Sequence, residues 1–315
     1  MKKWRVAIVG AGYMAQEHAR AFASLATVEI VGVCGRTKSR ADALANAHGT
    51  VAYESIEAMY QGTHADAVVV AVNELSMQVV CDSVFRRPWL CFLEKPVGID
   101  LPQALAIQAS ARFSGSRTFV ALNRRSYSAT RKAVEELSQS EGTRLISILD
   151  QQDAAAAAAS GQPQRVVQNY MFANSIHLVD YFCLFGRGEV DMVTPAVPWR
   201  EGGSPYVVAT IHFSSGDVGV YQAVWDGPGP WSVTVTDRAV RLELRPLEKL
   251  GIQRRGERRL TEVPTDPVDS DFKPGLRHQA EQVVRLLECG NAALPTLDEA
   301  TRSMTLCAEI YNRYG

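Results

Sequence analysis

A glycine-rich turn near the N-terminus is the first feature of this sequence with a definite chemistry. The pattern Gly-x-Gly-x-x-Ala lies directly between an apolar, β-rich run at 5–9 and a run of helical periodicity at 17–25. The first glycine permits a tight turn, the second lets backbone N–H groups approach a pyrophosphate, and a small third residue lets the helix pack on the strand. The helix N-terminus adds partial positive charge. We therefore expect a dinucleotide to contact Gly10, Gly12, Tyr13, Met14 and Ala15.

The end of the second expected strand indicates which dinucleotide is bound. An NAD enzyme usually carries Asp or Glu there, which binds the adenosine ribose hydroxyls and repels a 2′-phosphate. This sequence instead has Gly35, followed by Arg36, Thr37 and Lys38, with Arg40 one turn later. A neutral-to-basic cluster suits the additional phosphate of NADP. We expect NADP in preference to NAD; a solvated helix start and a backbone-mediated NAD site are the alternatives.

The elements that must position these residues alternate between strand and helix. Further strands are expected at 28–34, 67–72, 89–93 and 118–122, with helices at 39–48, 75–85 and 102–112. Strands that are apolar throughout are buried on both faces, and their alternation with helices requires a parallel sheet with right-handed crossovers. We therefore expect a doubly wound Rossmann α/β domain over residues 1–122.

The pattern changes after residue 122, which predicts a second, α+β domain over 123–315. Segments that alternate apolar and polar residues between turn signals indicate an open-faced antiparallel sheet with one covered face. They lie at 206–213, 218–224, 231–236 and 240–244, with another strand at 144–150 and helices at 130–138, 174–185, 276–288 and 297–311. The run Ala154–Ala159 is either a helix or a mobile loop tip, and we assign it no function.

Composition excludes several classes of partner. The chain has 315 residues and a formal net charge of −1, which argues against nucleic acid and against anionic membranes. No apolar run approaches the ~20 residues of a membrane helix. The six cysteines have no metal-type spacing, so we expect no metal site and interpret them as small core residues of a cytoplasmic protein.

Several motifs together resemble the Gfo/Idh/MocA family of oxidoreductases, the relatives of glucose-fructose oxidoreductase and inositol dehydrogenase. They are the glycine turn with His18, Glu94-Lys95-Pro96, Asn123-Arg124-Arg125, His177 with Asp180, and Pro295-Thr296. The Glu-Lys-Pro tripeptide is the most specific of them, and the likeness spans nearly the whole chain. It implies a nicotinamide cofactor, a sugar, inositol or nucleotide-sugar substrate, and a homodimer or homotetramer formed through the C-terminal sheet.

The resemblance also implies roles for individual residues. Lys95 is placed beside the nicotinamide and the reacting oxygen, where an ammonium donates a proton during carbonyl reduction. Glu94 binds ribose hydroxyls or orients Lys95, and a cis bond before Pro96 fixes the aim of that lysine. His177 is the second acid/base group, and Asp180, one helical turn later, orients the imidazole or the substrate.

Two departures from the family pattern bear on these roles. Many sugar and inositol dehydrogenases of the family carry Asp four residues before the histidine, where this chain has Ala173, so Asn174 is its partial replacement. The common Thr-Pro-Asn-x-x-His segment keeps only Asn73, and Ala71 and Asn73 remain expected cofactor contacts through backbone and van der Waals interactions.

Other residues leave two interpretations open. Arg124 and Arg125 either clamp a substrate phosphate or carboxylate or form an interdomain ion pair. Trp225 and Trp231 either supply a flat surface for a sugar ring, together with Tyr170, or belong to a rigid loop. The expected substrate contacts are Arg124, Tyr170, Asn174 and Asp180.

The expected activity is hydride transfer between NAD(P) and a carbinol or carbonyl, with a nucleotide sugar or related carbohydrate of surface-polysaccharide synthesis favoured by analogy. The alternative is a dinucleotide-binding regulatory or structural subunit without catalysis, because Ala173 and the altered segment after the third strand depart from the catalytic pattern. A third possibility keeps the enzyme class but recycles a tightly held cofactor in a net non-redox reaction.

Overall fold

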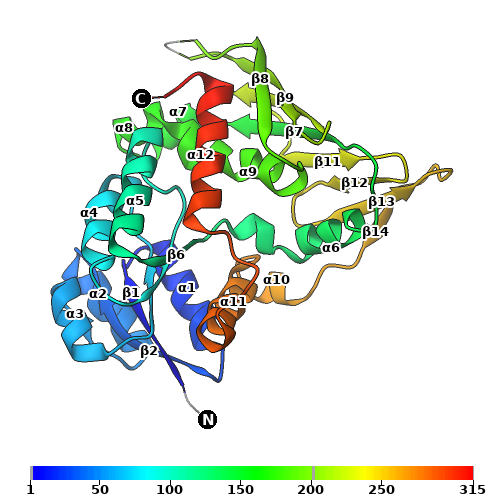
Figure 1. Cartoon of the computed structure of the whole chain (residues 1–315). Helices are drawn as coiled ribbons and strands as arrows, with labels where there is room; N and C mark the ends of the chain where they lie inside the picture. The colour runs from blue at the N-terminus through cyan, green and yellow to red at the C-terminus, as the bar shows by residue number, and fades with distance from the viewer. Residues whose placement is uncertain (1–2, 201–202, 315) are drawn as a thin grey trace. The chain divides into compact units, whose positions relative to one another are not determined.

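The structure is a computed structural model that describes residues 3–200 and 203–314, and these residues form two compact units (Figure 1). The first unit contains the described residues up to Gly98 together with Pro102–Asn123 and Ser270–Thr301. The second contains Ile99–Leu101, the described part of Arg124–Asp269, and the chain from Arg302 onward. This packing does not test the functional division at residue 122, which stays a prediction. The structure also shows that Ser270–Thr301, a segment late in the sequence, belongs to the first unit.

A six-stranded parallel sheet in the order β3-β2-β1-β4-β5-β6 forms the centre of the first unit. Its strands are β1 (Trp4–Val9), β2 (Val28–Cys34), β3 (Ala52–Tyr53), β4 (Ala67–Val70), β5 (Leu90–Leu93) and β6 (Arg117–Val120). The strand order reverses direction between β1 and β4, and ligands of such sheets bind beyond the carboxyl ends of the strands at that point. The predicted doubly wound sheet is confirmed.

Helices cover both faces of this sheet. They are α1 (Tyr13–Ala23), α2 (Lys38–Ala47), α3 (Ile56–Thr63), α4 (Glu74–Val84), α5 (Leu101–Ser114) and α11 (Leu276–Cys289). Val6 and Ile8 of β1 belong to the hydrophobic cluster on one face, whereas Ala7 and Val9 belong to the cluster on the other. Strand residues point alternately to the two faces, so burial of both faces explains the continuous apolar runs. Helix α11 packs against α1 (Figure 1).

Two details of the first unit differ from the sequence-based expectation. Helix α1 begins at Tyr13, directly after the glycine turn, rather than at residue 17. Tyr13 at the start of this turn is 63% exposed, whereas Ala15 in the same turn is fully buried. The short strand β3 and helix α3 were not expected, since a two-residue strand carries no periodic signal.

The second unit contains an eight-stranded sheet in the order β14-β13-β12-β11-β7-β10-β9-β8. Its strands are β7 (Leu145–Gln152), β8 (Val190–Val197), β9 (Tyr206–Phe213), β10 (Val218–Trp225), β11 (Ser232–Thr236), β12 (Val240–Leu244), β13 (Leu250–Arg254) and β14 (Thr261–Val263). Burial alternates along β7, β9 and β10, as expected for a sheet with one covered face. The expected antiparallel sheet is confirmed for most of the strand pairs, but β7 and β10 pair in parallel. Side-chain alternation does not encode strand direction.

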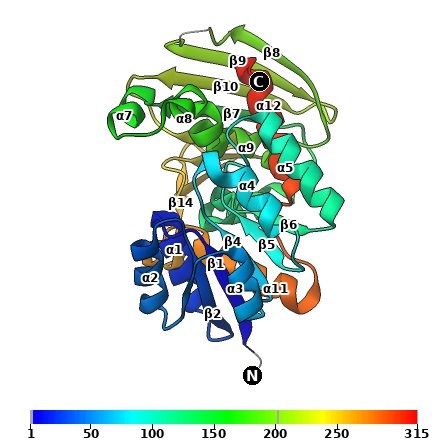
Figure 2. The same ribbon diagram turned by 90° about the vertical axis from the view of Figure 1, so that its left-hand side faces the viewer.

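The helices of the second unit lie on the covered face of its sheet and at its ends. They are α6 (Ser128–Leu137), α7 (Ala154–Ala159), α8 (Gln164–Gln168) and α9 (Ile176–Phe185), with a π-helical turn over Met171–Ser175 immediately before α9. Helix α9 packs on β7 and β11, and α7 lies beside α8 (Figure 2). The alanine run is helical, with the Asp153 side chain accepting a hydrogen bond from Ala156 N at 2.7 Å as its N-cap.

Three connecting elements complete the described fold: the 3-10 turn Asn123–Ser126, the helix α10 (Val268–Asp271) and the last helix α12 (Leu297–Tyr311). None of the helices formed by the described residues is long and apolar enough to cross a membrane. All six cysteines are free, and four of them are buried as expected, but Cys183 is half-buried and Cys289 is exposed, so the interpretation as a core residue was wrong for Cys289.

A buried carboxyl group lies beneath the sheet of the second unit. Asp150 accepts hydrogen bonds from the Tyr221 hydroxyl at 2.5 Å and from the Gln152 amide at 2.6 Å. The Tyr221 hydroxyl also lies 2.7 Å from that of Tyr311. Burial raises the pKa of Asp150, although the hydrogen bonds from its neighbours act in the opposite direction. The native state therefore favours the protonated form of this carboxyl group.

This raised pKa predicts a pH-dependent contribution to stability. Above the ordinary carboxyl pKa of about 4, unfolded Asp150 releases its proton while native Asp150 retains it, so its contribution to the free energy of unfolding falls as pH rises. Asn cannot ionise. The difference in free energy of unfolding between the native protein and Asp150→Asn, measured by urea titration, is therefore expected to be smaller at pH 8 than at pH 5. A difference that is constant or grows with pH would contradict this assignment.

Candidate functional site

The glycine turn has two glycines with different reasons for being glycine. Gly10 has a φ of +121°, and a Cβ on it would lie 2.1 Å from the carbonyl oxygen of Ala71. Gly12 has an ordinary φ of −84°, and a Cβ there would have nothing within 4 Å. The fold itself requires glycine at position 10. Nothing within the protein requires it at position 12, so open space is preserved there at the start of α1.

Helix α1 presents an uncapped N-terminus to that space. Gly12 is its N-cap residue, no side chain caps it, and its first turn carries no acidic residue. The first N–H groups of a helix lack partners within the helix, and the aligned peptide dipoles favour an anion beside them. This arrangement is suited to a pyrophosphate.

A cavity of about 590 Å³ adjoins this helix start at the carboxyl ends of β1, β2 and β4. It brings together many of the expected cofactor contacts. Lys38 is not among its lining residues and pairs with Asp42 at 2.8 Å. Tyr13, Met14 and Ala15 are not among its lining residues, and Ala15 is buried beneath the turn. The expected contacts that line the cavity are Gly10, Gly12, Gly35, Arg36, Thr37, Ala71 and Asn73.

Two features of this cavity were not expected from the sequence. Leu75 and Val79 line it from α4 and are 38% and 75% exposed, so they form an apolar wall suited to a flat base. Their spacing of four residues on one helix face was the available signal. Asn73 also has a structural role, because its Oδ1 accepts a hydrogen bond from Ser76 N at 3.0 Å as the N-cap of α4.

The Glu-Lys-Pro tripeptide directly follows β5. Glu94 is buried, with Oε1 2.7 Å from Nε2 of His18 and Oε2 accepting a hydrogen bond from the backbone N–H of Lys95 at 3.1 Å. His18 is itself buried and lies edge-on to Phe92. Glu94 therefore holds the backbone of Lys95, and His18 is a buried structural residue. The Lys95–Pro96 bond is cis, as expected.

In the second unit, His177 is buried at the start of α9 beside an arginine. Arg124 donates a hydrogen bond from Nη1 to Nε2 of His177 at 3.0 Å. The Arg124 guanidinium also lies over the Trp231 ring, 5.2 Å from its centroid. A guanidinium has no acceptor, so Nε2 must provide the lone pair and His177 is neutral in this arrangement.

Asp180 lies one turn beyond His177 but contacts other groups. Its carboxylate accepts two hydrogen bonds from Arg125, both at 2.8 Å, and one from the Ser303 hydroxyl at 2.6 Å. Bidentate pairing of this kind fixes both partners. The ion pair of Arg125 lies within the second unit rather than between domains. Arg124 and Arg125 therefore have different roles.

The remaining expected substrate contacts lie on the π-helical turn and its flanks. Asn174 donates a hydrogen bond to the Gln152 side chain at 2.8 Å, and Gln152 in turn donates one to the buried carboxyl group of Asp150. Tyr170 packs with an apolar cluster that includes Ala173. An apolar residue thus fills the place where many family members carry Asp. Trp225 is only 6% exposed, so it is a core residue rather than a flat surface.

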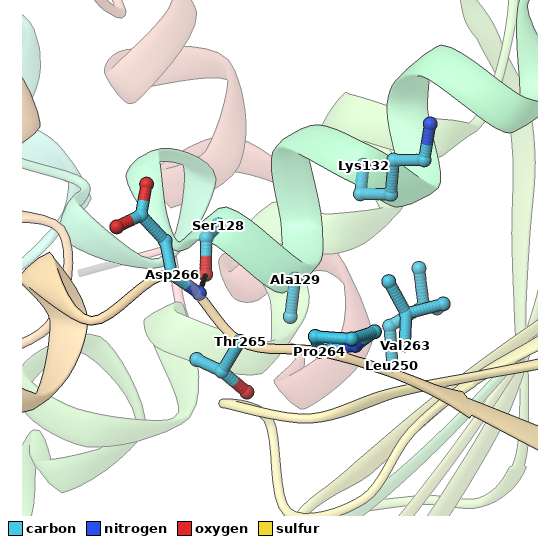
Figure 3. Close-up of a pocket in the computed structure, with 8 residues that line it drawn as sticks. All are labelled: Ser128, Ala129, Lys132, Leu250, Val263, Pro264, Thr265 and Asp266. Carbon is cyan, nitrogen blue, oxygen red and sulfur yellow. Dashed lines mark hydrogen bonds between the residues drawn. The ribbon is translucent and has the colours of Figure 1, made fainter.

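Another hollow, of about 270 Å³, lies between the start of α6 and the residues around β14 (Figure 3). Asp266 N donates a hydrogen bond to the Ser128 hydroxyl at 3.3 Å, and Lys132 pairs with Glu135 at 2.9 Å. This hollow holds no acid/base pair suited to catalysis. Within the described ranges, no group of three or more His, Cys, Asp or Glu residues could hold a metal ion.

Comparison with known proteins agrees with this geometry. Residues 4–122 match the model GFO_IDH_MocA, described as an oxidoreductase family with an NAD-binding Rossmann fold. Inositol 2-dehydrogenase of Rhizobium meliloti (strain 1021) is 27% identical over 135 residues, which is 42% of this chain. The aligned region is only 41% of that relative's length.

Solved structures share the fold along the whole chain. UDP-N-acetylglucosamine 3-dehydrogenase GnnA from Acidithiobacillus ferrooxidans is 16% identical with a TM-score of 0.81, covering 99% of this chain and 98% of that one. A putative myo-inositol dehydrogenase from Sinorhizobium meliloti 1021 is 17% identical with a TM-score of 0.71, covering 97% and 95%. GenD2 from gentamicin A biosynthesis, solved in complex with NAD, is 19% identical with a TM-score of 0.73, covering 100% and 95%.

The parallel sheet and its glycine turn define a Rossmann-type, nicotinamide-dinucleotide-binding oxidoreductase. Within that class, residues 4–122 match the model of the Gfo/Idh/MocA family, and the chain is similar to an inositol 2-dehydrogenase over 135 residues. The expected oxidoreductase class is thereby confirmed, and the match over residues 4–122 agrees with the expected family resemblance.

The two glycines give a matched pair of substitutions. Gly10→Ala is expected to lower the thermal midpoint strongly, by an amount that corresponds to ~2 kcal/mol or more, because its methyl group meets a backbone carbonyl at a strained φ. Gly12→Ala should keep the native midpoint but weaken NADPH binding about tenfold or more, because its methyl group occupies the space for the pyrophosphate. Unchanged NADPH affinity in Gly12→Ala, measured by calorimetric titration, would show that the dinucleotide binds elsewhere.

Proposed function

We propose that this chain is an NAD(P)-dependent oxidoreductase acting on CH–OH groups of a sugar, inositol or nucleotide sugar. The observation that carries the proposal is the cavity beside the uncapped start of α1, at the point where the strand order of the first sheet reverses. When bound, the nicotinamide supplies or accepts the hydride. The relatives named above as inositol and UDP-N-acetylglucosamine dehydrogenases support this class of substrate.

The residues of the first unit fit the parts of the dinucleotide. The glycine turn and the first N–H groups of α1 receive the pyrophosphate, and the apolar wall of Leu75 and Val79 receives the adenine. Glu94 holds the backbone of Lys95 through the hydrogen bond to its N–H group. In the proposed reaction, Lys95 donates a proton to the oxygen of the carbonyl that is reduced and takes it back in the reverse direction.

His177 is proposed as the second acid/base group. An imidazole can both donate and accept a proton, and Arg124 fixes the ring of His177 through Nε2. Asn174 is proposed as a substrate contact, held by Gln152, and Tyr170 as a neighbouring one. Asp180 acts through Arg125 rather than on the imidazole.

NADP is proposed as the preferred cofactor. Arg36 and Arg40 are exposed and line the cavity, and no carboxylate of the described residues lies within ion-pair distance of either. Two such guanidinium groups suit a 2′-phosphate. Lys38, by contrast, pairs with Asp42 outside the cavity.

This difference predicts the behaviour of three variants. Arg36→Ala and Arg40→Ala are each expected to weaken NADPH binding about tenfold while NADH affinity stays within twofold, because only NADPH carries the additional phosphate. Lys38→Ala is the matched control and should leave both affinities unchanged. If calorimetric titrations showed that the arginine variants lose equal affinity for NADPH and NADH, a 2′-phosphate site at Arg36 and Arg40 would be excluded.

Lys95→Met separates the enzyme from the alternative of a non-catalytic dinucleotide-binding subunit, which the apolar packing of Ala173 favours. We expect at least a hundredfold loss of turnover with NADPH affinity retained, because a proton donor of this kind contributes about 10²–10⁴-fold. The readout is steady-state oxidation of NADPH with a panel of keto-sugars and keto-inositols. If neither the native protein nor the variant shows turnover with any compound, the non-catalytic alternative is favoured.

The open face of the second sheet is the proposed contact of a homodimer or homotetramer. Met192 and Tyr206 are 53% and 57% exposed on β8 and β9. Burial of such side chains against a second copy would stabilise an oligomer. Sedimentation velocity of the native protein measures the assembly state directly, and a monomer at micromolar concentration would contradict this proposal.

A further inference from the structure

A separate cavity of about 320 Å³ lies within the second unit, and we call it the arginine cavity. Its walls come from the residue after Asn123, the loop before β11 and the turn after β12. The volume is at the lower end of the range for small-molecule sites, about 300–1,000 Å³. The residues that line it are Arg124, Pro230, Trp231, Arg245, Pro246, Leu247 and Glu248.

The charges of this cavity favour an anion. Arg124, Arg245 and Glu248 are the charged residues among those that line it, so the formal charge of the lining is two positive minus one negative, or +1. Arg245 is exposed and forms no ion pair with any residue in the described part of the chain. Guanidinium groups remain charged at all relevant pH values and match the geometry of phosphate and carboxylate groups.

The other walls favour a ligand with a ring and hydroxyl groups. Trp231 is held in one orientation, because its Nε1 donates a hydrogen bond to the carbonyl of Gln151 at 2.7 Å. Its fixed ring, together with Pro230 and Leu247, offers an apolar surface for the C–H face of a sugar. The carboxylate of Glu248 can accept hydrogen bonds from hydroxyl groups.

We propose that the arginine cavity binds a hydroxylated anion, that is, a sugar carrying a phosphate or carboxylate group. Arg124 and Arg245 hold the anionic group, Trp231 contacts the ring and Glu248 accepts hydroxyl hydrogen bonds. A guanidinium carries five N–H donors, so Arg124 can contact His177 and an anion together. The anionic group of the substrate is thereby fixed relative to His177. Only this link to the reaction rests on the function proposed above.

The test is equilibrium binding to the full chain, which requires no turnover. Glucose 6-phosphate, glucuronate and glucose are titrated calorimetrically into the native protein, Arg245→Gln and Arg255→Gln. Arg255 is an exposed arginine that does not line the cavity, so it is the matched control. We expect at least one anionic probe to bind the native protein about tenfold tighter than glucose, and Arg245→Gln to weaken that probe about fivefold or more.

Arg255→Gln should bind all probes as the native protein does. Preference for glucose 6-phosphate over glucuronate assigns the anion as a phosphate, and the reverse preference assigns it as a carboxylate. Equal binding of the charged and neutral probes, no binding of any probe, or equal effects of the two arginine substitutions would each overturn the proposal. Anion binding without NADPH turnover would leave the cavity assignment intact while contradicting the proposed oxidoreductase activity.

Discussion

The close approach of Gly10 to the carbonyl of Ala71 is the constraint on which the dinucleotide site depends. A Cβ at position 10 would lie 2.1 Å from that oxygen, so only glycine lets the chain leave β1 and turn over the end of β4. The turn then delivers Gly12 to the start of α1 and opens the cavity beside it. The uncapped start of α1, Arg36 and Arg40, and the exposed apolar side chains of α4 all border this cavity.

In the second unit, hydrogen bonds and ion pairs hold the candidate site residues in place. Arg125 is fixed by Asp180 and Ser303, whereas the neighbouring Arg124 lies over Trp231 and reaches His177. Two adjacent arginines thus divide between a structural ion pair and a candidate substrate contact. The buried Asp150 group holds Asn174 through Gln152, beneath the π-helical turn. Such turns occur frequently at functional sites because they interrupt regular helix geometry.

Local patterns in the sequence predicted the first unit well. The turn at Gly10 and the boundaries of β2 depend on neighbouring residues, and the structure agrees with both, whereas the cis bond before Pro96 was implied by the family resemblance. Contacts between residues that are far apart in the sequence could not be predicted. His18 meets Glu94 across 76 positions, and Arg124 meets His177 across 53, and no periodicity records such pairs. The parallel pairing of β7 with β10 was missed for the same reason, since alternation reveals a covered face but not a strand direction.

We propose that a dinucleotide held by the glycine turn exchanges hydride with a carbohydrate. Transfer of deuterium from C4-deuterated NADPH to a panel of keto-sugars, keto-inositols and keto-nucleotide sugars, followed by mass spectrometry of the products, tests it directly. We expect the label on the new carbinol carbon of at least one product, with transfer lost in Lys95→Met. Tight binding of NADPH with no label in any product would contradict the claim.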